Sequence, residues 1–249
     1  PEVLSASLRS LRGVLAAARE EGFDVGLTVV ADRSRHSQLD QIIEFFTTLP
    51  SGQPYGLRET DLGDLGRARN VAVAATERAY VAFFDADDLW SRNWVAAGVR
   101  RLKSAQASEN APDAIVINSD FNVVFDGQRV IEISRNLEST HPVPSATYAV
   151  ANFSTSQIIT TRALVEGIPF PDRADDQAFG FEDWEWSRLI AEEGALRRIA
   201  PRTYHFVRRE AQAESLMRIL GPRRPRRPRA GSRPRGRGRR RRRGCRRVR

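Results

Sequence analysis

The stretch "VAFFDADDLW" at residues 81–90 places three carboxylates directly after an apolar run. The apolar residues are typical of a buried strand, whereas Asp85, Asp87 and Asp88 fall within four positions. Like charges this close repel and raise each other's pKa, so an opposite charge must offset the cost. Carboxylate oxygens are hard ligands that suit Mg²⁺ or Mn²⁺. The stretch predicts a divalent-cation site, and the alternative is a solvated turn in which Asp88 caps the next helix.

The pattern of apolar residues around this stretch predicts strands that alternate with helices. Helices are expected at 2–20, 38–49, 66–75 and 91–105, and strands at 25–31, 80–85 and 113–120, with a loop at 50–62. Such alternation favours a layered α/β fold with parallel strands, which present ligand sites beyond their carboxyl ends. The Asp126–Gly127 pair predicts a hairpin, so the second half of the sheet should be mixed.

The net charge of +9 is unevenly distributed. Residues 222–249 hold sixteen arginines and no acid, which leaves residues 1–221 with a net charge of −7. The single cysteine, Cys245, excludes a disulfide framework and a cysteine-based zinc site within one chain. No apolar run approaches the roughly 18 to 20 residues of a membrane-spanning helix. We expect a cytoplasmic protein, or one peripheral to a membrane surface.

The arginine-rich tail differs from the rest of the chain. Residues 221–249 contain almost no apolar side chain, so we expect them to be disordered. Sixteen arginines should bind polyanions such as nucleic acid in a salt-sensitive, nonspecific way. One alternative function is therefore an inert domain whose tail binds polyanions. The composition also resembles translation of a GC-rich reading frame other than the native one.

Two longer motifs resemble those of a known family. The stretch "LGRARNVAVAATERAYVAFFDADDLW" at 65–90 and the acidic pair in "FGFEDWEWSRLIAEEG" at 179–194 resemble the signatures of family 2 glycosyltransferases. "VVADRS" at 29–34 is similar to the family's second-strand pattern V-V-D-D-G-S. Asp32 keeps one acid of that pattern, whereas Ala31 and Arg33 replace the other acid and the glycine. The resemblance covers roughly residues 1–210.

The resemblance implies a GT-A-like fold, with a three-layer mixed sheet and flanking helices, over residues 1–220. Family members begin with an apolar strand that lies centrally in the sheet, whereas this sequence enters its first helix at residue 2. We therefore expect a domain that lacks this strand and is less stable than one that has it, because neighbouring strands would expose unpaired backbone groups.

The activity that the resemblance implies is inverting transfer of a sugar from a nucleotide-diphosphate donor to an acceptor hydroxyl, with Mn²⁺ or Mg²⁺. The acceptor itself is not identified. The candidate residues are Asp183 or Glu182 as the catalytic base; Asp32, Arg69, Asp85 and Trp184 for the nucleotide sugar; and Asp87, Asp85 and His205 for the metal.

Elementary chemistry agrees with these roles, although each residue has a structural alternative. A diphosphate leaving group needs positive charge, and the acceptor hydroxyl needs a carboxylate base. However, Glu182 and Asp183 could be ordinary first-turn acids, Arg69 a structural ion pair and His205 a packed residue. Nucleotidyl transfer is a third possible activity, but it would favour a glycine-rich phosphate loop with a lysine, and Lys103 is the only lysine.

Overall fold

The computed structural model describes residues 2–109, 111–125, 129–134, 141–149, 155–172 and 182–208. The arginine-rich tail lies outside these residues, as do the expectations about its disorder and polyanion binding. The elements in chain order are α1 (Glu2–Glu20), β1 (Leu27–Asp32), α2 (His36–Thr47), β2 (Tyr55–Thr60), α3 (Leu65–Ala74), β3 (Tyr80–Ala82), β4 (Leu89–Trp90), α4 (Trp94–Gln106), β5 (Ile115–Phe125), β6 (Val130–Ile133), η2 (Ser145–Ala149), β7 (Ile159–Thr161), α5 (Arg162–Gly167), α6 (Glu182–Glu192) and β8 (Leu196–Arg208).

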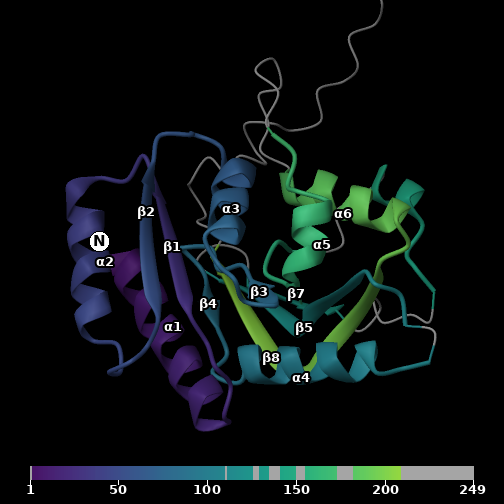
Figure 1. The fold of residues 1–249 in the computed structure, drawn as a ribbon, viewed down its shortest axis with the longest axis horizontal. Helices are drawn as coiled ribbons and strands as arrows, with labels where there is room; N and C mark the ends of the chain where they lie inside the picture. Colours follow the sequence, from purple (N-terminus) through teal and green to yellow (C-terminus); the bar gives the residue numbers. More distant parts are fainter. Residues whose placement is uncertain are drawn as a thin grey trace, which may run out of the picture.

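The larger sheet is mixed and lies between two layers of helices (Figure 1). Its strand order is β3-β7-β5-β8-β4, with β6 paired to β5. The β5–β8 pairing is parallel, whereas the other pairings in this sheet are antiparallel. In Figure 1, α4 runs along one face of the sheet and α5 and α6 cover the other. The expected three-layer mixed α/β architecture is therefore confirmed. The parallel pairing expected of strands that alternate with helices is wrong for most of this sheet, where among the described residues it occurs only between β5 and β8.

Alternate residues of β5 supply the two hydrophobic cores. Ile117 packs with Trp94 and Leu102 of α4 in a core that also includes α1 and α2. Its neighbour Val116 packs with Trp186 of α6 in the second core, together with α3 and α5. Successive side chains of a strand point to opposite faces, so a strand buried on both faces is apolar at consecutive positions. This explains why "AIVI" has no alternation.

A second, two-stranded sheet is made of β1 and β2, which pair in parallel from Leu27↔Tyr55 to Asp32↔Thr60. The expectation that residues 50–62 form only a loop is thus wrong. β2 has the sequence "YGLRET", and all its residues are exposed or half-buried. A strand with one open edge needs few apolar residues. Its sequence therefore lacks the apolar pattern that would have predicted a strand. In the described residues β1 pairs with β2 alone, and the expectation of a missing central strand stays a prediction.

The hairpin expected around Asp126–Gly127 is confirmed by the flanking strands. Residues 126–128 lie outside the described part, but Val124 of β5 pairs with Val130 of β6 in an antiparallel ladder. β5 runs without interruption to Phe125, so the strand expected at 113–120 and the first strand of the hairpin are one strand. The strand expected at 80–85 is instead shorter, because β3 ends at Ala82 and the acidic stretch forms a turn.

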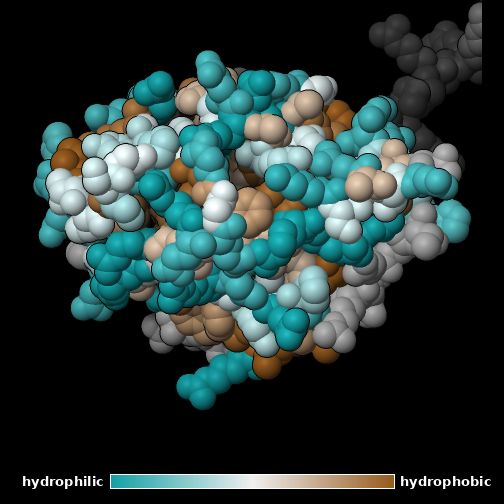
Figure 2. All heavy atoms as spheres, turned by 60° about the horizontal axis from the view of Figure 1, so that its bottom comes forward, coloured by the Kyte–Doolittle hydropathy of each residue, from teal (hydrophilic) through white to brown (hydrophobic). Residues whose placement is uncertain are grey.

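The surface is mostly hydrophilic on the face that Figure 2 shows, with apolar residues in small separate groups. In the described residues, no helix is long and apolar enough to cross a bilayer.

His205 lies in the core, so we do not assign it to the metal site. It is completely buried, with its ring edge-to-face against Trp94 at 4.4 Å between centroids and stacked against Trp90 at 6.0 Å. Neither ring nitrogen has a hydrogen-bond partner among the described residues. Burial therefore favours the neutral ring and lowers the pKa of His205 from 6.5 to about 3.

We expect His205 to make the fold sensitive to mild acid. The unfolded chain binds a proton below about pH 6.5, whereas the buried ring does not until about pH 3. The contribution of His205 to the free energy of unfolding is therefore largest above about pH 6.5. It decreases by about 2 kcal/mol between pH 7 and pH 5. Chemical denaturation at both pH values should show that the free energy of unfolding falls by about 2 kcal/mol more in the native chain than in His205→Phe, since the other titrating groups affect both chains equally. A loss in His205→Phe equal to that of the native chain would contradict the assignment.

Candidate active site

The acidic stretch forms a tight turn between β3 and β4. The backbone N–H of Asp88 donates to the carbonyl of Asp85 at 3.1 Å, which closes the turn. Ala86 and Asp87 are exposed at its tip, whereas Asp88 is buried with 5% of its surface accessible. The alternative that Asp88 caps the next helix is wrong, because α4 begins at Trp94 with Asn93 at its N-cap. Asp87 is therefore accessible to a ligand from solvent, whereas Asp88 is not.

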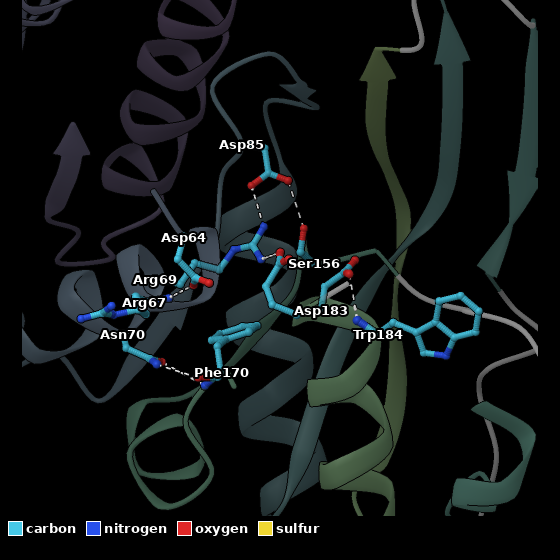
Figure 3. A network of polar contacts seen from close by, with 10 residues as sticks. Asp64, Arg67, Arg69, Asn70, Asp85, Ser156, Phe170, Asp183 and Trp184 are labelled. Carbon is cyan, nitrogen blue, oxygen red and sulfur yellow. Dashed lines mark hydrogen bonds and ion pairs between the residues drawn. The ribbon is translucent and has the colours of Figure 1, made fainter. Parts of the chain in front are cut away.

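Arg69 joins the two acidic motifs that are about 100 residues apart in the sequence (Figure 3). Its Nη2 donates to Asp85 Oδ1 at 3.0 Å, and its Nη1 forms a short ion pair with Glu182 Oε1. The Arg69 side chain is 6% exposed. Burial alone would lower its pKa, but the charges of Asp85 and Glu182 raise it, so the guanidinium keeps its charge. The structure thus brings residues of α3, the turn and α6 together.

Gly66 and the side-chain amide of Asn70 position helix α3 for this contact. A Cβ on Gly66 would lie 2.7 Å from the carbonyl oxygen of Pro171 and 3.2 Å from Glu182 Cβ, so only glycine allows this approach. Asn70 makes two hydrogen bonds with the backbone of Phe170, donating to its carbonyl at 2.8 Å and accepting from its N–H at 2.9 Å. The Phe170 ring lies beneath the guanidinium of Arg69. The G-x-x-R-N spacing therefore fixes one helix face against the segment before α6.

Glu182 and Asp183 open α6 as expected, but their surroundings differ. Glu182 pairs with Arg69, while Asp183 Oδ1 accepts from the backbone N–H of Trp184 at 2.8 Å. Burial, and then the charge of Glu182, raise the pKa of Asp183 to about 6, although Arg69 opposes the shift. A carboxylate with a pKa near neutral pH suits proton transfer.

Trp184 extends from this site toward η2. Its indole Nε1 donates to the carbonyl of Tyr148 at 2.5 Å, and the side chain is half-buried. Tyr148 is held in turn by Arg197, whose Nε donates to the tyrosine hydroxyl at 2.9 Å. Trp186, two residues further on, packs in the second core.

Asp32 lies at the end of β1, where it organises the loop before α3. Its Oδ1 accepts from Leu62 N at 2.6 Å and from the Thr60 hydroxyl at 2.9 Å, and its Oδ2 accepts from Gly63 N at 2.8 Å. Burial raises its pKa, but these hydrogen bonds outweigh burial and lower it overall. The next residue, Arg33, has φ 51°, a conformation that favours glycine, which is the residue in the family pattern.

The described residues contain no group of three or more histidine, cysteine or acidic side chains that could enclose a metal ion. Mg²⁺, however, typically uses one or two protein carboxylates and completes its shell with phosphate and water. Asp87 is exposed at the tip and Asp85 is 26% exposed beside it. These hard oxygen donors fit a divalent cation that is shared with a phosphate ligand.

Several contacts of the site were not predicted from the sequence. Ser156 Oγ donates to Asp85 Oδ2 at 3.0 Å, and Gln157 donates to Asp88. Both lie just before β7, in a stretch with no motif of its own. Asp64 caps α3 by accepting from Arg67 N at 2.8 Å, and the aspartate before "LGRARN" is a signal that would have revealed it.

Comparison with known proteins identifies the family of the chain. The model of "Glycosyl transferase family 2" matches residues 4–165, which is more than half of the chain. The chain belongs to this family. The sequence matches no curated protein.

The family 2 chain is also similar in fold to several solved structures. Residues 1–349 of S. aureus TarS in complex with UDP-GlcNAc superpose with a TM-score of 0.62 at 17% identity, covering 84% of this chain and 56% of TarS 1–349. GalNAc-T7 with UDP, GalNAc and Mn²⁺ gives a TM-score of 0.50 at 13% identity, covering 77% of this chain and 39% of that one. The chain thus spans little more than half of the TarS fragment.

We expect Arg69→Met to destabilise the fold by roughly 3 kcal/mol, because it would leave Asp85 and Glu182 partly buried without their cation. Urea denaturation would measure the change. Arg67→Met is the matched control, since Arg67 is exposed on the same helix and should cost less than about 0.5 kcal/mol. Equal effects of the two changes would show that the bridge contributes nothing.

Proposed function

We propose that this protein transfers a sugar from a nucleotide-diphosphate donor to an acceptor hydroxyl with inversion at the anomeric carbon. The carrying observation is the Asp85–Arg69–Glu182 bridge, which joins the acidic turn to the helix that bears Asp183. A single site can therefore hold a diphosphate at the turn and a base at α6. TarS with UDP-GlcNAc and GalNAc-T7 with UDP supply the analogy for the donor.

Asp183 is the proposed catalytic base. Inversion by single displacement requires the acceptor oxygen to attack the anomeric carbon while the bond from that carbon to the diphosphate oxygen breaks. The hydroxyl proton passes to a carboxylate oxygen of Asp183, and the nucleotide diphosphate leaves with the bonding electrons. Glu182 is less suited to this role because it is paired with Arg69, whereas burial and Glu182 raise the pKa of Asp183 toward neutrality.

Asp87 and Asp85 are the proposed metal-binding residues, with Mn²⁺ or Mg²⁺ as the ion. The ion would supply electrostatic stabilisation of the diphosphate leaving group. Arg69 keeps Asp85 in place from the protein side. Asp32 supports nucleotide binding by ordering the loop at residues 60–63, and Trp184 offers an aromatic face to a sugar ring.

A donor screen tests the proposal. Release of nucleotide diphosphate from nucleotide sugars, with Mn²⁺ or Mg²⁺ present, should be at least roughly 100-fold slower in Asp87→Ala, because metal stabilisation of a leaving group contributes several kcal/mol. Asp40→Ala on α2 removes an exposed carboxylate elsewhere and should leave the rate unchanged. An Asp87→Ala variant that retains the native rate would refute the metal-dependent mechanism.

The pH dependence tests the base. Since Asp183 must be ionised and its pKa is about 6, kcat/KM should rise with pH through about 6 and level off above it. In Glu182→Gln the neighbouring negative charge is lost, so the inflection should move to lower pH. Asp183→Asn should lower kcat by roughly 10²- to 10⁴-fold without this inflection. An inflection that persists in Asp183→Asn would assign the base to another residue.

A further inference from the structure

Two consecutive residues contact both ends of the acidic turn. Ser156 donates to Asp85, the first residue of the turn, and Gln157 donates to Asp88, the last. We infer that Ser156 and Gln157 are positioning residues, which clamp the turn so that Asp87 is presented to the metal and diphosphate. This inference rests on the proposed function, and it assigns to the segment before β7 a role in donor binding. We call the pair Ser156 and Gln157, together with Asp88, the clamp.

The orientation of the Gln157 amide follows from its two neighbours. The indole Nε1 of Trp90 can only donate, and it lies 2.7 Å from Gln157 Oε1. Both carboxyl oxygens of Asp88 accept hydrogen bonds, and Oδ2 accepts from Gln157 Nε2. An amide, with one acceptor and one donor side, satisfies both partners at once. Gln157 is 1% exposed, so water does not compensate for a mismatch.

Asp88 connects the clamp to Arg208, the last residue of β8. While its Oδ2 receives Gln157, its Oδ1 accepts from the backbone N–H of Arg208 at 2.8 Å. The turn is thus tied to β8 through Arg208 and to the aromatic cluster of Trp90, Trp94 and His205 through Gln157. A buried carboxylate is costly unless its oxygens are hydrogen-bonded, and here each oxygen has a donor. Asp88 therefore acts as an anchor within the turn.

The clamp holds both ends of the turn and leaves its tip exposed. Asp85 is held by Arg69 and Ser156, and Asp88 by Gln157 and Arg208. Asp87 lies between these anchors on the exposed tip. Supporting residues that orient metal ligands commonly change metal affinity by about 10- to 100-fold when they are altered. Gln157 is placed to have that effect without touching the ligand itself.

An exchange of the amide and the carboxylate tests the clamp. In Gln157→Glu, two carboxylates would face each other in the core. In Asp88→Asn, an amide donor would face either Gln157 Nε2 or the N–H of Arg208. In the double variant Asp88→Asn/Gln157→Glu, the amide now at position 88 can donate to the carboxylate now at position 157 and still accept from Arg208. That carboxylate can also accept from Trp90, so the three hydrogen bonds described above are restored with the same net charge.

The readout is binding of UDP with Mn²⁺, measured by titration calorimetry on chains whose folding is checked by circular dichroism. We expect each single change to weaken binding by about 10- to 100-fold and the double variant to recover to within a few-fold of the native chain. Gln106→Glu adds the same charge on the exposed surface of α4 and should bind like the native chain. Ser156→Ala, which removes only the hydroxyl that donates to Asp85, should weaken binding by several-fold.

The outcomes separate this inference from the proposed function. If the native chain binds none of UDP, GDP, CDP and dTDP with Mn²⁺, the proposed function fails, and if Asp87→Ala binds as tightly as the native chain, the metal-dependent mechanism fails. A nucleoside diphosphate that binds in place of UDP serves as the probe in every measurement. If Asp87→Ala loses binding while Gln157→Glu keeps it, or the double variant folds but stays as weak as the singles, the clamp is refuted and the proposed function stands. If Gln157→Glu does not fold, recovery of both folding and binding in the double variant supports the clamp, and recovery of folding alone refutes it.

Discussion

The site depends on one buried cation between two carboxylates. Arg69 pairs with Asp85 and with Glu182, and its charge is permanent because a guanidinium does not lose its proton in proteins. Without that charge the acidic turn and the start of α6 would repel each other. The glycine at 66 lets the arginine helix approach closely enough for both contacts. A single ion-pair bridge thus determines where the two acidic motifs meet.

Because of this bridge, neighbouring acidic residues differ in charge compensation and in pKa. Glu182 faces the cation, which compensates its charge, whereas Asp183 remains next to Glu182 in a partly buried position. Burial and like-charge repulsion together raise the pKa of Asp183 to about 6. At the turn, Asp88 is buried and hydrogen-bonded, whereas Asp87 is exposed. Neighbouring carboxylates therefore differ in burial and charge compensation because their partners differ.

The sequence alone misjudges residues whose role depends on what packs against them. His205 follows the expected order along the chain, yet Trp90 and Trp94 enclose its ring. β2 gives no strand signal because an exposed edge strand carries no apolar pattern. Ser156 and Gln157 show no motif, since serine and glutamine are common and only their partners make them specific. In each case the missing information is a contact between segments distant in sequence.

What the sequence determined by itself was local: apolar periodicity located helices α1 to α4 and the buried parts of β1 and β5, and the spacing of acids in "DADD" and "EDW" indicated the candidate site. Such signals survive in a single sequence because they depend on neighbours within a few residues. The tertiary structure decided which acid pairs with Arg69, which carboxylate is buried and which histidine is excluded from the site. Those outcomes depend on charge, burial and hydrogen bonds between segments up to 120 residues apart, such as Asp88 and Arg208, and only the folded chain brings these segments together.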